Sequence, residues 1–115
     1  MDNAVTLAGT LTYEPLGKTT GDEKVPMCRF TIGVRRQWTD RRTGEAKDFT
    51  THHEVVCYRS LATHVLESCQ KGDHVVIIGR LNTRSGYDDN KTDKITEIIA
   101  DHVALDVTHA AIPFD

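Results

Sequence analysis

The 115-residue chain lacks the features of several protein classes. No apolar run approaches the roughly 18–20 residues that span a bilayer. Residues 1–3 (Met-Asp-Asn) offer neither the basic flank nor the apolar stretch of a signal peptide. Three cysteines, at positions 28, 57 and 69, form an odd and widely spaced set without a CxxC pair. We therefore expect a cytoplasmic chain with reduced thiols and no membrane association.

The sequence also lacks motifs for catalysis and for cofactor binding. It contains no Gly-rich phosphate loop, nucleophile elbow or paired-carboxylate pattern. On one strand, His53 and Cys57 would lie about 13 Å apart at roughly 3.3 Å per residue. Zinc donors lie only about 2.0–2.3 Å from the metal, so this pair cannot share an ion. We therefore expect no enzyme activity, no metal site and no cofactor.

β-Branched residues are abundant, and the charges are unevenly distributed. Val, Ile and Thr together exceed a quarter of the chain, which argues against an all-α protein. The net charge is −3. Residues 29–59 nevertheless carry an excess of cations, most of them arginine, and residues 80–115 carry an excess of acids. Arginine can both pair with phosphate and stack on a base. Charge alone favours an ordinary solvated surface.

Alternation of apolar and polar residues predicts five strands and one helix. The strands fall at 3–13, 28–35, 47–58, 74–84 and 95–100, with 102–107 as a candidate extension of the last. Gly9 marks a bulge or a bend in the first strand. Residues 16–26 are predicted as a loop and 40–45 as a polar hairpin tip. Ser60 can cap a helix over 61–70, and Gly72 suits the C′ position that follows the end of a helix.

Three strands, one helix and two strands form the plan of an OB-fold. We therefore predict an all-β fold, β-rich with one short helix: a five-stranded Greek-key barrel with the helix between strands 3 and 4. Residues 1–107 form the domain and residues 108–115 a short C-terminal tail. On pattern alone, another small α+β sandwich is the alternative.

Several motifs resemble, in order along the chain, those of the bacterial single-stranded DNA-binding protein family. These motifs are Val5-x-Leu7-x-Gly9-x-Leu11, Arg36-Gln37-Trp38-x-Asp40, Thr51-His52-His53-x-Val55-Val56, Lys71-Gly72-x-x-Val75-x-Ile77-x-Gly79-x-Leu81-x-Thr83-Arg84, and Thr96-Glu97-Ile98-Ile99-Ala100-Asp101-x-Val103-x-Leu105. The resemblance covers nearly the whole chain. It implies an OB-fold, usually assembled as a homotetramer, that binds single-stranded DNA in replication, repair and recombination without catalysis. Other OB-fold modules remain alternatives, either an RNA-binding module or a primosomal accessory protein.

Binding of an unpaired strand needs flat side chains that stack on bases, and stacking tolerates all four bases. Trp38 shares the parity of core residues, but the polar residues 35–37 before it favour exposure. Tyr58 shares an outward face with His52, and the family carries aromatic residues at both positions. Tyr87 lies near a third family tryptophan. Phe49 has the parity of the core, and we expect it to be buried.

Binding of phosphates needs cations along the same path. The expected phosphate contacts are Arg35, Arg36, Arg59, Arg80, Arg84, Arg41 and Arg42, although each could be ordinary surface charge. Because stacking area is smaller than in the family, we expect affinity to depend strongly on arginine and on salt. The family has a histidine near its subunit contact at the position of His53, which we therefore assign to the subunit interface.

The last residues depart from the family. The resemblance implies a flexible linker and an acidic tip, Asp-Asp-Asp-Ile-Pro-Phe, that docks partner enzymes. Here Ile112-Pro113-Phe114 echoes that tip, but the linker and the preceding acids are missing and Asp115 follows. The match is either a coincidence or a shortened tail. Both readings put recruitment of partner enzymes in doubt, and they suggest a secondary paralogue or a trimmed chain.

Overall fold

The computed structural model describes residues 4–21, 24–85 and 94–108. In chain order these form β1 (Ala4–Leu11), β2 (Leu16–Thr20), β3 (Val25–Thr39), β4 (Ala46–Tyr58), α1 (Arg59–Ser68), β5 (His74–Ser85) and β6 (Lys94–Leu105). Within these residues, no helix has the length and apolar character needed to cross a membrane. The described residues are therefore β-rich with one short helix, as predicted.

Five of the strands close on themselves. The neighbours run β1–β5–β6–β4–β3, and β1 returns to β3 through the pairs Thr10–Gly33 and Leu11–Ile32. These contacts are antiparallel except that between β4 and β6, where Val55 pairs in parallel with Ile98. We call this arrangement the closed sheet, and it is that of an OB-fold.

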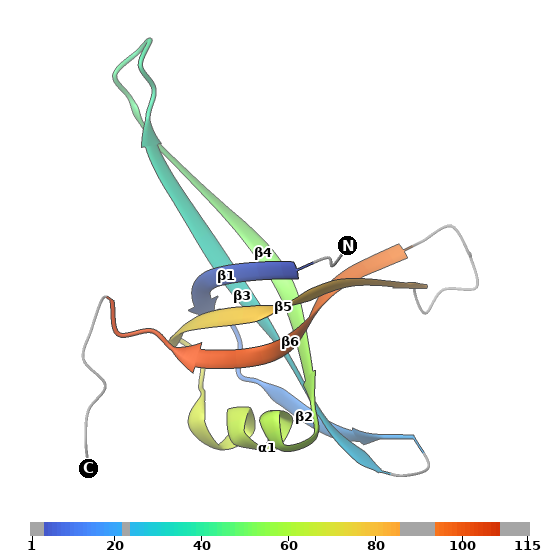
Figure 1. Cartoon of the computed structure of the whole chain (residues 1–115). Coiled ribbons are helices and arrows are strands. Elements are labelled where there is room, and N and C mark those ends of the chain that lie inside the picture. The colour runs from blue at the N-terminus through green and yellow to red at the C-terminus, as the bar shows by residue number, and fades with distance from the viewer. Residues whose placement is uncertain (1–3, 22–23, 86–93, 109–115) are drawn as a thin grey trace.

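The core lies inside the closed sheet, where the predicted alternation places apolar side chains. It is built by Leu11, Cys28, Phe30, Ile32, Val55, Cys57, Ala62, Val65, Val75, Ile77, Ile98 and Ala100. Ala62 and Val65 come from α1, which packs mainly against β3 and covers one end of the closed sheet (Figure 1). Burial of each large apolar side chain contributes about 1.5–3 kcal/mol, and this term opposes the conformational entropy cost of folding.

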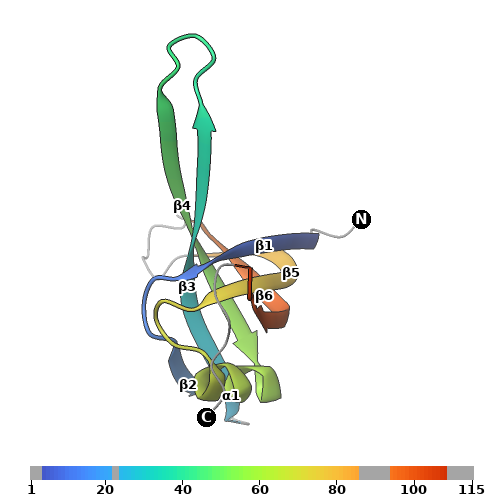
Figure 2. The same ribbon diagram turned by 90° about the vertical axis from the view of Figure 1, so that its left-hand side faces the viewer.

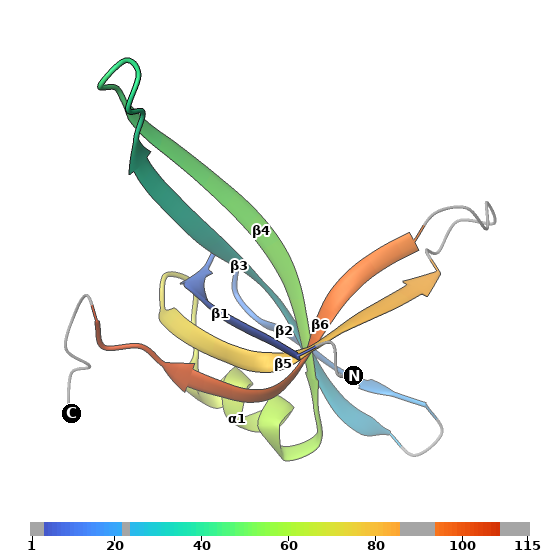
Figure 3. The ribbon, with the colours of Figure 1, turned by 45° about the horizontal axis from the view of Figure 1, so that its top comes forward.

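The β3–β4 hairpin continues far beyond the closed sheet. β1 pairs with β3 only as far as Gly33, and β6 pairs with β4 at Val55 and Val56. Residues 35–50, which we call the arm, therefore pair only with each other among the residues that the structure describes. The arm leaves the molecule on the side opposite α1 (Figure 2). It also diverges from the β5–β6 pair, so that two hairpins point in different directions (Figure 3).

Three local predictions were wrong. Residues 16–20 form β2, an edge strand paired with β3, rather than part of a loop. The helix begins at Arg59 after an extended Tyr58, so Ser60 lies inside its first turn and does not cap it. It ends at Ser68, before Gly72, whose φ of 95° belongs to the following turn. The division into a domain (1–107) and a tail (108–115) stays a prediction, because residues 109–115 lie outside the described residues.

Candidate nucleic-acid interface

The arm has two chemically different faces. Residues directly opposite each other in an antiparallel pair share a face, and neighbours along a strand alternate. The pairs Arg36–Phe49 and Trp38–Lys47 therefore form one face, which we call the aromatic face. Arg35–Thr50 and Gln37–Asp48 form the other, which we call the polar face. The candidate contacts on the paired strands of the arm can be sorted by this alternation.

Trp38 is exposed on the aromatic face, with 47% of its surface accessible. The guanidinium carbon of Arg36 lies 5.8 Å from the centre of its ring system, within the range of a cation–π contact. The expectation that the core ends before Trp38 is confirmed. Its role in stacking stays a prediction.

Phe49 was expected in the core, and this expectation was wrong. Its side chain is 54% exposed and lies across from Arg36. The parity was read correctly, because Phe49 does share the face of Val55. However, that face leaves the closed sheet at about Val34, and no described residue of the arm belongs to the core cluster. Sequence reasoning therefore missed an exposed aromatic residue close to Trp38.

On the polar face, a cation and a carboxylate pair with each other. The guanidinium of Arg35 donates to both carboxylate oxygens of Asp48, with Nε at 3.0 and 3.1 Å and Nη2 at 2.6 Å. These hydrogen bonds raise the pKa of Arg35 and lower the pKa of the Asp48 carboxyl. Arg35 is thus already paired, and its predicted contact with phosphate would compete with Asp48.

The cations near the end of the arm differ from Arg35 in their surroundings. Lys47 Nζ lies 3.1 Å from Glu45 Oε2 in an exposed pair of the kind that contributes little to stability. Arg41 and Arg42 are exposed on the tight turn that joins the strands. There Asp40 Oδ1 accepts a hydrogen bond from the backbone N–H of Arg42 at 2.8 Å. Both arginines are free to approach a ligand from the tip.

The outer face of the closed sheet holds the second group of predicted contacts. Tyr58 and His52 are both exposed, Tyr58 by 38%, and they share one face of β4. Val56 lies between them on the same face, but it is fully buried. Arg80 is exposed on β5, where it pairs with Ile99 of β6.

Sequence reasoning missed an ionic cluster on this outer face. Arg29 contacts Glu54, and its Nη1 lies 3.2 Å from Oε2 of Glu97, which is only 3% exposed. Asn82 Nδ2 adds a hydrogen bond to Glu97 Oε1 at 3.4 Å. Two carboxylates thus share one guanidinium next to Tyr58 in the register, so the cluster carries a net negative charge. This charge makes the outer face less favourable for phosphates than the arm.

The remaining predicted residues are scattered. Arg59 is exposed at the start of α1 with a φ of 62°. His53 is half-buried, and its Nε2 lies 3.1 Å from Thr51 Oγ1. The side chain of Arg84 and the whole of Tyr87 lie outside the described residues. These four assignments stay predictions.

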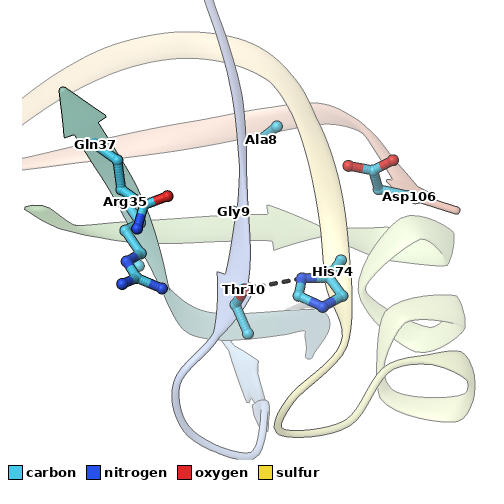
Figure 4. A pocket seen from close by; sticks show the side chains of 8 residues that line it. Ala8, Gly9, Thr10, Arg35, Gln37, His74 and Asp106 are labelled. Carbon is cyan, nitrogen blue, oxygen red and sulfur yellow. Dashed lines mark hydrogen bonds between the residues drawn. The ribbon is translucent and has the colours of Figure 1, made fainter. Parts of the chain in front are cut away.

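A polar hollow lies at the base of the arm. It measures about 470 Å³ and is lined by Ala8, Gly9, Thr10, Gly33, Arg35, Gln37, His74 and Asp106. Figure 4 shows Arg35 and Gln37 on β3 at one side and the hydrogen bond between Thr10 Oγ1 and His74 Nδ1, 3.0 Å long, at the other. Within the described part of the chain, no group of three or more His, Cys, Asp or Glu side chains could hold a metal ion. The lining combines hydrogen-bonding side chains with the small residues Ala8, Gly9 and Gly33.

Comparison with known proteins gives consistent matches. The model of the Single-strand binding protein family matches residues 2–106. A single-stranded DNA-binding protein of Caldanaerobacter subterraneus subsp. tengcongensis is 33% identical over 105 residues, which span 90% of this chain and 67% of that protein. The small single-stranded DNA-binding protein of Streptomyces coelicolor superposes with a TM-score of 0.79 at 24% identity, over 96% of this chain and 98% of that one. The Plasmodium falciparum SSB in complex with ssDNA gives 0.73 at 29% identity, over 85% of each chain.

Proposed function

The chain belongs to the single-strand binding protein family, and we propose from this premise that it binds single-stranded DNA without regard to base sequence. The observation that carries the proposal is the exposed Trp38, with the guanidinium of Arg36 against its ring, on an arm that reaches away from the closed sheet. An exposed π-surface beside a cation suits both parts of an unpaired strand.

The energetics favour a sequence-tolerant contact. Stacking on an aromatic side chain contributes about 1–3 kcal/mol per base, and every base has a flat face. Each phosphate that a cation neutralises adds a slope of about −0.7 to the dependence of log K on log salt. With one tryptophan in the chain, phosphate contacts carry a large share of the affinity. We therefore expect binding to weaken steeply as salt is added.

We assign the contacts as follows. Trp38 stacks on a base, with Tyr58 and His52 as further stacking residues on the outer face and Tyr87 as a fourth. Arg36, Arg41 and Arg42 contact phosphates from the arm, while Arg80, Arg84 and Arg59 extend the path over the closed sheet. Arg35 joins this path only where phosphate displaces it from Asp48. The exposure of the described members and the lack of an ion pair at Arg36 within the described residues support this assignment.

The biological role follows from this chemistry. A protein that covers unpaired DNA protects it during replication, repair or recombination, and it needs neither a cofactor nor a catalytic residue. We propose that this chain is such a binding protein and not an enzyme, that it acts at DNA in the cytoplasm, and that it assembles as a homotetramer with His53 at a subunit contact.

Titration with oligo-dT tests the proposal, because Trp38 is the single tryptophan and therefore reports directly on the arm. We expect its fluorescence to be quenched at low salt, and the affinity to fall at higher salt. Oligo-U of equal length separates DNA from RNA preference, since only RNA carries the 2′-hydroxyl. Absence of binding to oligo-dT at low ionic strength, by fluorescence and by filter retention, would overturn the assignment. Tighter binding of oligo-U would favour an RNA-binding module.

A further inference from the structure

Phe49 is an exposed aromatic residue with no role in the assignment above. It comes from β4, and its side chain is more than half exposed. A single exposed apolar side chain is common and needs no explanation. The position of this one matters, because the register puts it on the aromatic face with Trp38, Arg36 and Lys47.

The two rings are close enough to act on one strand. Phe49 lies opposite Arg36, and Trp38 lies two residues beyond Arg36, so the rings occupy diagonal positions of the antiparallel pair. Such positions are about 7–8 Å apart between Cα atoms, within reach of large side chains. The guanidinium of Arg36 lies on the Trp38 ring and beside Phe49 across the strand pair. Two flat apolar surfaces therefore flank a cation.

The opposite face of the arm has none of these properties. It presents Gln37 and Thr50, and its one cation, Arg35, is paired with Asp48. On the aromatic face, Arg36 forms no ion pair within the described residues, and Lys47 pairs only with the exposed Glu45. Charge complementarity to a polyanion and apolar ring surface thus coincide on one side. The chemistry that matches both is a run of unpaired nucleotides.

We propose that Phe49 is a second base-stacking residue and that a single strand of DNA crosses the aromatic face, with bases on Trp38 and Phe49 and phosphates toward Arg36 and Lys47. This inference rests on the proposed function and adds a specific path. The strand runs along the arm on the face continuous with the core, rather than on the polar face. His52 and Tyr58 lie on the other side of β4 and meet a different part of the strand.

An aromatic cross-strand neighbour could also simply stabilise the arm, by about 0.2–1 kcal/mol per pair. The two roles predict different dependence on the ligand. Stacking requires a base, whereas an ordered arm would help any phosphodiester chain. An oligonucleotide of abasic sites, which keeps the phosphates and lacks the bases, therefore separates the two roles.

The experiment compares the affinity of full-length variants for oligo-dT and for an abasic oligomer of equal length, by filter retention. We expect Phe49→Ala to bind oligo-dT roughly 5- to 150-fold more weakly, the equivalent of one stacked base. Its affinity for the abasic oligomer and its salt slope should stay close to those of the wild type. Phe49→Leu should lose nearly as much as Phe49→Ala, and Phe49→Trp should restore binding. Tyr13→Ala, which removes an exposed aromatic ring from outside the arm, is the matched control and should have no effect.

The outcomes separate this inference from the proposed function. If Trp38→Ala weakens binding to oligo-dT but Phe49→Ala does not, the stacking role of Phe49 is wrong and the proposed function stands. An equal loss for Phe49→Ala on both oligomers would mean that Phe49 only orders the arm, which also overturns the inference. Failure of the wild-type protein to bind oligo-dT would instead overturn the proposed function.

Discussion

A Cβ atom on Gly9 would lie 2.6 Å from the carbonyl oxygen of Gly33, where β1 passes from its pairing with β5 to its pairing with β3. No side chain fits between the two backbones at this distance. The closure of the sheet therefore depends on a residue that contributes nothing but its small size. The sequence predicted a bend at Gly9, and the structure shows that close approach of two strands is the reason for the glycine.

We expect Gly9→Ala to lower the free energy of unfolding by about 1–3 kcal/mol, because backbone atoms must move apart. Gly79→Ala should cost more, since its Cβ would lie 2.2 Å from the carbonyl oxygen of Ile99. Gly33→Ala should cost least, because its nearest neighbour is a methyl group of Thr12 at 3.2 Å. Urea unfolding of the three variants measures this order. A different order would show that the close contacts of an added Cβ atom do not set the cost at these positions.

Arg29 compensates the charge of the buried Glu97. Arg29→Met should destabilise the fold by up to about 3 kcal/mol, because it leaves a carboxylate in the sheet without its cation. The double variant Arg29→Met/Glu97→Gln should recover part of that loss. Arg80→Met, on an exposed site, serves as the control and should change stability by less than about 0.5 kcal/mol. Thermal unfolding at neutral pH distinguishes the three. An equal loss for the single and the double variant would contradict a charge effect.

Two neighbouring arginines of the arm should differ in their effect on DNA binding. Arg36→Gln should weaken binding to oligo-dT and reduce the magnitude of the salt slope by about 0.7, the contribution of one phosphate. Arg35→Gln should have a smaller effect on both, because Asp48 already matches its charge. Each variant removes one positive charge from the same strand, so the comparison controls for net charge. Equal effects would mean that DNA contacts both faces of the arm.

The ion pair on the polar face should persist well into acid. Its hydrogen bonds from Arg35 lower the pKa of Asp48. A carboxyl with a lowered pKa in the folded state contributes its interaction above the pKa of the unfolded chain, near 3.9. That contribution is lost as the pH falls through the lower pKa of the folded state. A side-chain carboxyl NMR titration should show the shift in the wild type and its disappearance in Arg35→Gln. An unshifted titration in the wild type would contradict the pair.

The thiols should be unreactive in the folded protein. Cys28 and Cys57 lie directly opposite each other in β3 and β4, and both are fully buried. The hydrogen bond with Cys28 and burial raise the pKa of Cys57, and burial raises the pKa of Cys69. We expect alkylation at neutral pH to modify Cys69 slowly and the other two only after denaturation, as peptide mass spectrometry would detect. Rapid modification of Cys57 in the native protein would contradict this packing.

The sequence was sufficient for the order of the long strands and for the position of the hairpin tip. Within the strand predicted at 28–35, the alternating residues Cys28, Phe30 and Ile32 lie in the core, and the polar tip predicted at 40–45 falls at the turn between β3 and β4. It was not sufficient for β2, since residues 16–20 carry no alternation and become a strand only by pairing with the edge of β3. Tertiary pairing, rather than local propensity, forms that element.

The candidate site was harder to predict than the fold. The argument that predicted an exposed Trp38 also holds for Phe49, because the two residues lie diagonally across the arm. Applying it to Phe49 required knowing where the core ends on β4 as well as on β3. The pairing of Arg35 with Asp48 follows from a diagonal relation across the same register. Charge counts along the chain cannot show it, because the two residues are thirteen positions apart.

The arm contributes almost nothing to the core, and no described residue of the closed sheet needs its tip for support. We therefore expect changes there, including insertions at the turn, to leave the rest of the domain folded. The surface that we propose for DNA contact is therefore separate from the residues that hold the scaffold together, so substitutions there can adjust affinity without a compensating change in the core.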